Sequence, residues 1–91
     1  MNTQTITEEL VGILEGAGVT IRRESMGGSG GGLCLFKNKK VFFYDTDAGP
    51  YESACMCAKA VSQVVGDLEN MYLKPAVREF IYRNTGTGVP E

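Results

Sequence analysis

Residues 33–44 read LCLFKNKKVFFY, two apolar runs separated by a short polar segment. This stretch decides the fold, because two such runs joined by so few residues predict a β-hairpin. Asparagine tolerates the left-handed backbone conformation that a tight turn requires, so we place the turn at Asn38-Lys39. The resulting register sets Phe36 opposite Val41.

Both faces of this predicted hairpin are apolar, which burial of one face does not explain. One face would carry Cys34, Phe36, Val41 and Phe43. The other face would carry Leu33, Leu35, Phe42 and Tyr44. An exposed apolar face of this size exceeds what monomers usually tolerate, and a two-fold dimer covers it with an identical face. We therefore predict self-association through the sheet, with the second set as interface candidates, unless the helices divide between both faces.

The residues before the hairpin predict one helix and one strand. Thr5-Ile-Thr-Glu8 has the pattern of a capping box, with Thr5 as N-cap of a helix over about residues 6–17. Residues 19–25 alternate between apolar and polar and then become wholly polar, which predicts a short, half-buried strand.

The residues after the hairpin predict two further helices. Pro50 fits the first turn of a helix that carries an apolar stripe. Pro75 opens another helix, after an extended segment. The predicted fold is α+β, in the order α-β-β-β-α-α, with helices packed on an antiparallel three-stranded sheet. We expect a single domain over residues 1–84 and a flexible tail over residues 85–91.

The composition excludes several classes of function. A chain of 91 residues with a net charge of −2 lacks the basic surplus of a non-specific nucleic-acid binder. It has no apolar run long enough to cross a membrane. It contains no histidine, so Ser-His and Cys-His catalytic pairs and His-ligated zinc are excluded. Its three cysteines are an odd number, and no secretion signal precedes them, so we expect a cytoplasmic protein without cofactors.

A glycine-rich stretch, MGGSGGG at residues 26–32, raises the question of ligand binding. Phosphate-binding loops lead into a helix, and the Walker A loop also carries Gly-Lys-Ser/Thr; this stretch leads into a strand and lacks that lysine. We therefore favour a flexible loop. The alternative is an anion or small-molecule site formed by Gly28, Gly30, Gly31, Arg22 and Arg23.

Two aspartates follow the hairpin. The segment from Val41 to Asp47 resembles the first motif of haloacid-dehalogenase-type phosphotransferases, which implies Asp45 as nucleophile, Asp47 as acid/base and a magnesium ion nearby. The commoner use of such residues is a turn in which Asp47 or Gly49 caps the following helix, and we favour it.

Two further resemblances cover at most about residues 30–80. The hairpin, the helix after Pro50 and the segment Pro75-Ala-Val-Arg-Glu79 resemble small uncharacterised bacterial proteins, which imply no activity. The hairpin and the helix after it are also similar to zinc peptidases that cleave repressors. In those enzymes this helix carries His-Glu-x-x-His, whereas residues 51–61 here contain no histidine, so no site residue is implied.

These observations favour a non-enzymatic cytoplasmic domain that acts by protein–protein contact as a homodimer, with any further protein partner unknown. The alternatives are an anion or small-molecule binder at the glycine loop and a magnesium-dependent phosphotransferase at Asp45 and Asp47.

Overall fold

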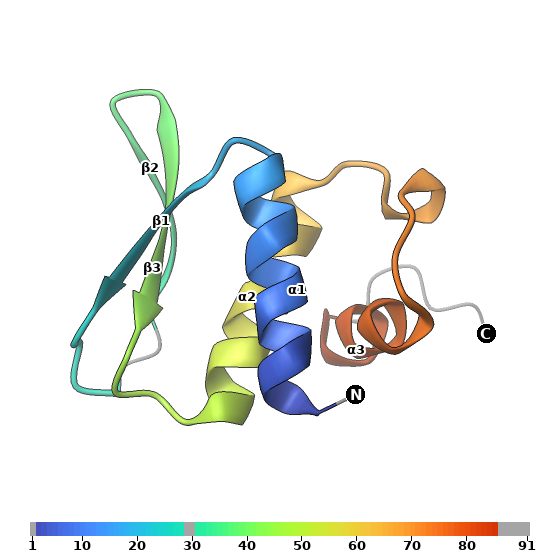
Figure 1. Ribbon diagram of the computed structural model, residues 1–91. Helices are drawn as coiled ribbons and strands as arrows, with labels where there is room; N and C mark the ends of the chain where they lie inside the picture. The colour runs from blue at the N-terminus through green and yellow to red at the C-terminus, as the bar shows by residue number, and fades with distance from the viewer. Residues whose placement is uncertain (1, 29–30, 86–91) are drawn as a thin grey trace.

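The computed structural model describes residues 2–28 and 31–85. Figure 1 shows three layers: the sheet, then α1 with α2, then α3. The elements are α1 (Thr3–Gly16), β1 (Thr20–Glu24), β2 (Gly32–Phe36), β3 (Lys39–Asp45), α2 (Pro50–Val64), η1 (Leu68–Asn70) and α3 (Pro75–Thr85). The α+β class is confirmed, with three α-helices and a three-stranded sheet. The element order differs from the predicted one, because the short 3₁₀ helix η1 lies between α2 and α3.

The sheet is mixed, so the prediction of an antiparallel sheet is wrong. Its strand order is β1-β3-β2, with β1 parallel to β3 and β2 antiparallel to β3. β1 and β2 follow one another in the chain but lie at opposite edges of the sheet, with β3 between them. The apolar strand β3 thereby gains a neighbour on each side, and its position in the centre gives it the greatest burial.

The hairpin is confirmed, but the predicted register is wrong by two residues. Its turn is Lys37-Asn38, with φ angles of 51° and 65°, and Leu33 pairs with Phe42. Two left-handed residues form a turn whose twist matches that of the flanking strands. A shift of two residues leaves every side chain on its predicted face.

All three helices lie on one side of the sheet (Figure 1). Phe42 is 1% exposed, and Ile21 and Leu33 on the flanking strands pack against the same core. The core continues into both helical layers through Leu10, Leu14, Val61, Val77 and Ile81. None of these helices covers the other side of the sheet.

Helix α1 begins earlier than predicted. Asn2 is its N-cap and accepts a hydrogen bond at Oδ1 from the Thr5 backbone N–H, at 2.8 Å. The predicted capping box with Thr5 as N-cap is therefore wrong, because asparagine is the stronger cap and stands one turn earlier. Helix α2 begins at Pro50 as predicted, with Gly49 at the N-cap.

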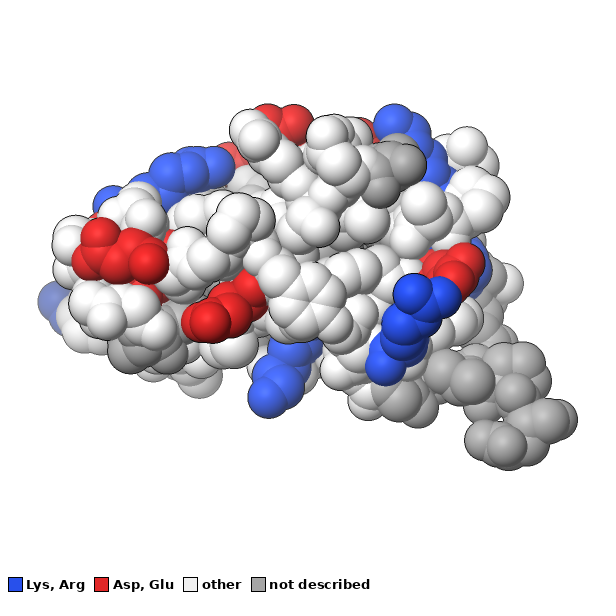
Figure 2. Space-filling view, turned by 90° about the horizontal axis from the view of Figure 1, so that it is seen from below, with Lys and Arg blue, Asp and Glu red and all other residues white. Residues whose placement is uncertain are grey.

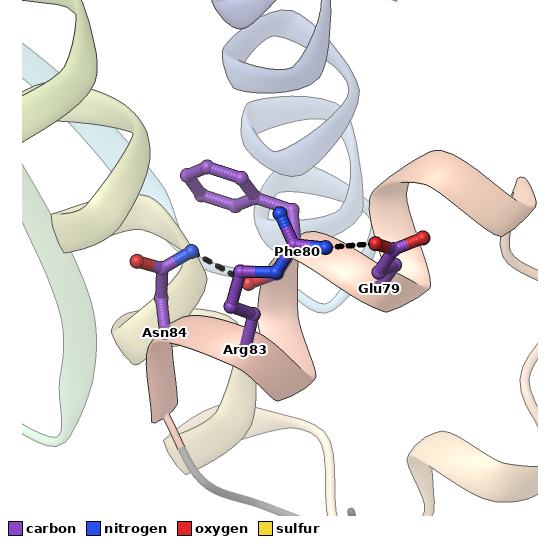
Figure 3. Close-up of polar contacts among 4 residues, drawn as sticks. All are labelled: Glu79, Phe80, Arg83 and Asn84. Carbon is purple, nitrogen blue, oxygen red and sulfur yellow. Dashed lines mark hydrogen bonds and ion pairs between the residues drawn. The ribbon is translucent and has the colours of Figure 1, made fainter.

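Helix α3 is joined to α2 by a polar and aromatic contact (Figure 3). The Phe80 ring points toward α2 and packs in a T-shaped arrangement with the Tyr51 ring, with ring centroids 6.1 Å apart. Asn84 accepts a hydrogen bond from the Tyr51 hydroxyl at 3.0 Å and donates one to the Phe80 carbonyl at 2.9 Å. Glu79 and Arg83 form an ion pair on the exposed side of the helix.

Arg78 joins α3 to the segment before it. Its guanidinium donates to the Leu68 carbonyl at 3.1 Å and to the Met71 carbonyl at 2.6 Å. Of the tail predicted for residues 85–91, Thr85 is the last residue of α3 and residues 86–91 lie outside the described part. None of the described helices has the length and apolar character needed to span a membrane.

Candidate functional site

The glycine loop and the two aspartates lie at the same end of the sheet (Figure 1). The loop follows β1, and Asp45 is the last residue of β3. Because β1 and β3 are parallel and Glu24 pairs with Asp45, the residues after each strand meet. The carboxyl ends of parallel strands are the usual place for ligand sites in sheets flanked by helices.

Asp45 anchors the start of the glycine loop. Its side chain is 2% exposed, and its Oδ1 accepts hydrogen bonds from the backbone N–H groups of Met26, at 3.0 Å, and Asp47, at 2.9 Å. A buried carboxylate is costly unless it is hydrogen-bonded, so these contacts are what allow Asp45 to be buried.

Asp47 continues this anchor at the surface. Its Oδ2 accepts hydrogen bonds from the Gly27 N–H, at 2.9 Å, and from the Ser25 hydroxyl. The amides of Met26 and Gly27 are thus directed at carboxylates of the same chain. An incoming anion would meet two negative charges here, which opposes its binding.

The glycines of the loop have distinct roles. Gly27 and Gly28 have φ angles of 73° and 84°, in the region that favours glycine. Gly31 has a φ of 65°, and a Cβ there would lie 2.0 Å from the carbonyl oxygen of Phe43. Glycine at this position therefore permits a close approach of two backbone segments. Gly30 lies outside the described residues.

The two arginines do not share a site, because successive strand residues point to opposite faces. Arg22 lies on the side without helices, where it pairs with Glu24 at 2.8 Å and stacks over Phe43 at 5.8 Å. Arg23 lies on the side that faces the helices, with its guanidinium carbon 5.6 Å from the centre of the Tyr44 ring. No ion pair involves Arg23 within the described part of the chain.

Arg23 and Tyr44 line a groove of about 490 Å³ between α1 and the sheet. The α1 wall includes Glu8, Gly12 and Glu15. The floor extends to the start of α2, where Ser53 lies. We call this the α1 groove. The parallel pairing that places Arg23 in the same groove as the acidic residues of α1 was not visible in the sequence.

The cysteines lie in three different environments. Cys34 is exposed on β2, Cys55 is half-buried and Cys57 is buried, and all three are free thiols. Burial raises the pKa of Cys57 to about 12, and the nearby positive charge of Arg23 offsets part of this effect. Cys57 is therefore an unreactive core residue. Residues 2–28 and 31–85 contain no group of three or more cysteine, aspartate and glutamate side chains that could hold a metal ion.

The interface candidates differ in exposure. Phe42 is buried within its own chain and has no surface for a partner, while Leu33 and Tyr44 are half-buried against the core. Leu35 is 70% exposed, and its neighbour Phe36 is 63% exposed. The surface open to a second chain is therefore the edge of β2 rather than the whole predicted face.

Figure 2 views the molecule from the end where β1 and β3 stop and α1 and α2 start. Positive and negative side chains are interspersed around a broad uncharged area, so the described residues form no patch of a single sign on this face.

Comparisons with protein-family models, curated proteins and solved structures find no match.

Proposed function

We propose that this protein acts by protein–protein contact in the cytoplasm and that its partner is a second copy of the same chain. The proposal rests on the outer edge of β2, which is an unprotected edge of the sheet. This strand, GLCLF, contains no charged residue and no proline, and it lies at the edge of the sheet. Exposed edge strands of this kind pair readily with other strands.

The two edges of the sheet differ in their protection. Three of the five residues of β1, Arg22, Arg23 and Glu24, are charged, which is how proteins usually block unwanted pairing. β2 lacks this protection, and its own residues Leu35 and Phe36 are exposed. The difference supports β2 as the contact edge.

The hairpin register determines which main-chain groups are available. Residues that flank a two-residue turn form a hydrogen-bonded pair, and every second pair repeats it. Phe36 and Cys34 therefore direct their N–H and C=O groups toward β3, since they pair with Lys39 and Val41. The corresponding groups of Leu33 point away from the sheet, as do those of Leu35.

These groups favour one two-fold arrangement. An antiparallel pair of β2 strands centred on Cys34 sets Leu33 of each copy opposite Leu35 of the other, and it pairs all five residues of the strand. It also brings the lysine-rich turn of each copy toward the end of its partner's sheet that holds Asp47. Opposite charges would then meet at both ends of the contact.

The oligomeric state tests the proposal. Light scattering and sedimentation of the full chain should show a dimer whose population rises with concentration up to the millimolar range. Leu35→Lys should give a monomer, whereas Tyr72→Lys, which adds the same charge at a residue 86% exposed between η1 and α3, should leave the dimer intact. A single-chain mass over the whole concentration range would contradict the proposal.

Cys34 provides a test of the register. Opposing residues of a non-hydrogen-bonded antiparallel pair have Cα atoms about 4.5 Å apart, within the range that a disulfide spans. Diamide, which accepts the two electrons and two protons, should therefore link two chains through Cys34. Cys34→Ser should remove this link without changing the oligomeric state. A dimer that does not cross-link would retain self-association and exclude this register.

A second function, anion binding at the glycine loop, receives less support. The Met26 and Gly27 amides that would bind an anion are directed at Asp45 and Asp47. The same contacts show that both aspartates hold the loop, which weighs against a phosphotransferase at this position.

A further inference from the structure

The α1 groove has the size of a small-molecule site. Its volume of about 490 Å³ falls within the range of about 300–1,000 Å³ that is typical of ligand pockets. It lies against β1 and β3, whereas the β2 edge lies on the far side of the sheet. A ligand in the groove and a second chain on β2 would therefore not compete for the same surface.

The walls of the groove carry opposite charges that do not meet. Arg23 belongs to the sheet wall, and Glu8 and Glu15 belong to the α1 wall. Among the described residues, none of these three takes part in an ion pair. Their neighbours behave differently, because Arg22 pairs with Glu24 and Glu9 pairs with Lys74 at 3.2 Å. The charges that line the groove are therefore not neutralised by ion pairs with described residues.

The position of Arg23 identifies the nearer carboxylate. β1 runs in the direction opposite to α1, so its last residues lie beside the first turns of the helix (Figure 1). Glu8 lies toward that end and Glu15 toward the other, about 10 Å away along the helix axis. A small ligand would therefore lie between Arg23 and Glu8.

Ser53 adds a polar group to the lining of the same groove. Its residue is 6% exposed, and its hydroxyl makes no hydrogen bond to any described residue. It stands in the first turn of α2, where the partial positive charge of the helix N-terminus favours a carboxylate. The hydroxyl lines the groove and has no partner in the described part of the chain, so it is available to a ligand.

Gly12 keeps the middle of the groove open. It lies inside α1, where glycine is less stable than alanine by about 0.5–1 kcal/mol. A Cβ at Gly12 would meet no atom within 4 Å, so packing within the chain does not require glycine. The missing side chain instead leaves room in the groove.

We propose that the α1 groove binds a small zwitterionic amino-carboxylate, an α-amino acid or a dipeptide. Arg23 and the Ser53 hydroxyl bind the carboxylate, and Glu8 binds the ammonium group. This ligand class supplies a negative charge for Arg23 on the sheet wall and a positive charge for Glu8 on the α1 wall. A ligand with only one charge leaves Arg23 or Glu8 unpaired.

Amide NMR titration of the full chain tests the proposal, with each common L-amino acid and glycylglycine as probes. At least one probe should give saturable shifts at the amides of Arg23, Tyr44 and Ser53. The corresponding amine without a carboxylate, and the acid without an amine, should each bind at least about tenfold more weakly, because each lacks one charge-assisted contact.

Matched variants locate the site. Arg23→Gln and Glu8→Gln should each weaken binding about tenfold or more, whereas the neighbours Arg22→Gln and Glu9→Gln, which lie outside the groove, should not. Gly12→Leu should fill the groove and abolish binding. Retained amide dispersion in the free variants will show that each one is folded.

Three results would overturn the proposal. The first is the absence of saturable shifts in the groove with every probe. The second is binding that persists unchanged in both Arg23→Gln and Glu8→Gln. The third is equal affinity for the zwitterion and its singly charged analogues. None of these results bears on self-association through β2, which is measured separately.

Discussion

Gly31→Ala tests the close approach between the glycine loop and β3. A Cβ at Gly31 would lie 2.0 Å from the Phe43 carbonyl oxygen and 2.9 Å from the carbonyl carbon. Both atoms belong to the backbone of the central strand, so neither can rotate away as the end of a side chain could. Gly31 also has a φ of 65°, which alanine adopts only with strain.

The expected loss of stability has two parts. The left-handed conformation costs about 1–2 kcal/mol for a residue with a Cβ. The steric conflict costs about 1–3 kcal/mol, as overpacking of a well-packed site typically does. The sum, about 2–5 kcal/mol, is a large part of the roughly 5–14 kcal/mol expected for a domain of this length at about 0.05–0.15 kcal/mol per residue.

Gly27→Ala is the matched control. Gly27 also has a left-handed φ, of 73°, but a Cβ there would meet no atom within 4 Å. Its substitution should cost only the conformational part, about 1–2 kcal/mol. Urea unfolding of both variants should therefore show Gly31→Ala to be less stable than Gly27→Ala by about 1–3 kcal/mol. Equal losses would refute the close approach.

Two further predictions concern the core and the last helix. Burial raises the pKa of Cys57 to about 12 from 9.0, so between these pH values the folded chain keeps a proton that the unfolded chain releases. The contribution of Cys57 to the free energy of unfolding is therefore fully present below about pH 9 and is lost as the pH rises toward 12. Urea midpoints measured from pH 8 upward should fall more steeply for the native chain than for Cys57→Ala, and parallel curves would contradict this. Arg78→Lys should cost about 1–3 kcal/mol of unfolding free energy, since lysine lacks the fork that reaches two carbonyl groups. Arg83→Lys, at an exposed ion pair, should change stability by less than about 1 kcal/mol in the same urea assay, and an equal loss in both variants would argue against the fork.

Local patterns predicted the elements of this fold well, because they depend on residues close in the chain. The hairpin follows from two apolar runs around Asn38, and α2 and α3 begin at Pro50 and Pro75 as expected. The turn was misplaced by one residue, since Lys37 gives no sign of the left-handed conformation it adopts. The faces were still correct, because a register error of two residues preserves the alternation of side chains.

The pairing of β1 was not predictable in the same way. Parallel pairing depends on which edge of β3 the strand reaches, and that is set by the path of the chain between β1 and β2 rather than by β1 itself. The sequence directed attention separately to the glycine loop and to Asp45 with Asp47. Their contact exists only because Glu24 and Asp45 are paired, so the site could not be assembled before the topology was known.

The same topology separates the two proposed surfaces. The α1 groove uses Arg23 at the β1 side of the sheet, and self-association uses Leu35 at the β2 edge, with β3 between them. Arg23 faces the helices and Leu35 extends beyond the part of the sheet that the core buries. Each surface can therefore be altered without removing a contact of the other. Leu35→Lys should leave ligand binding intact, and Arg23→Gln should leave the dimer intact. Each variant should therefore lose only the function of the surface that it changes.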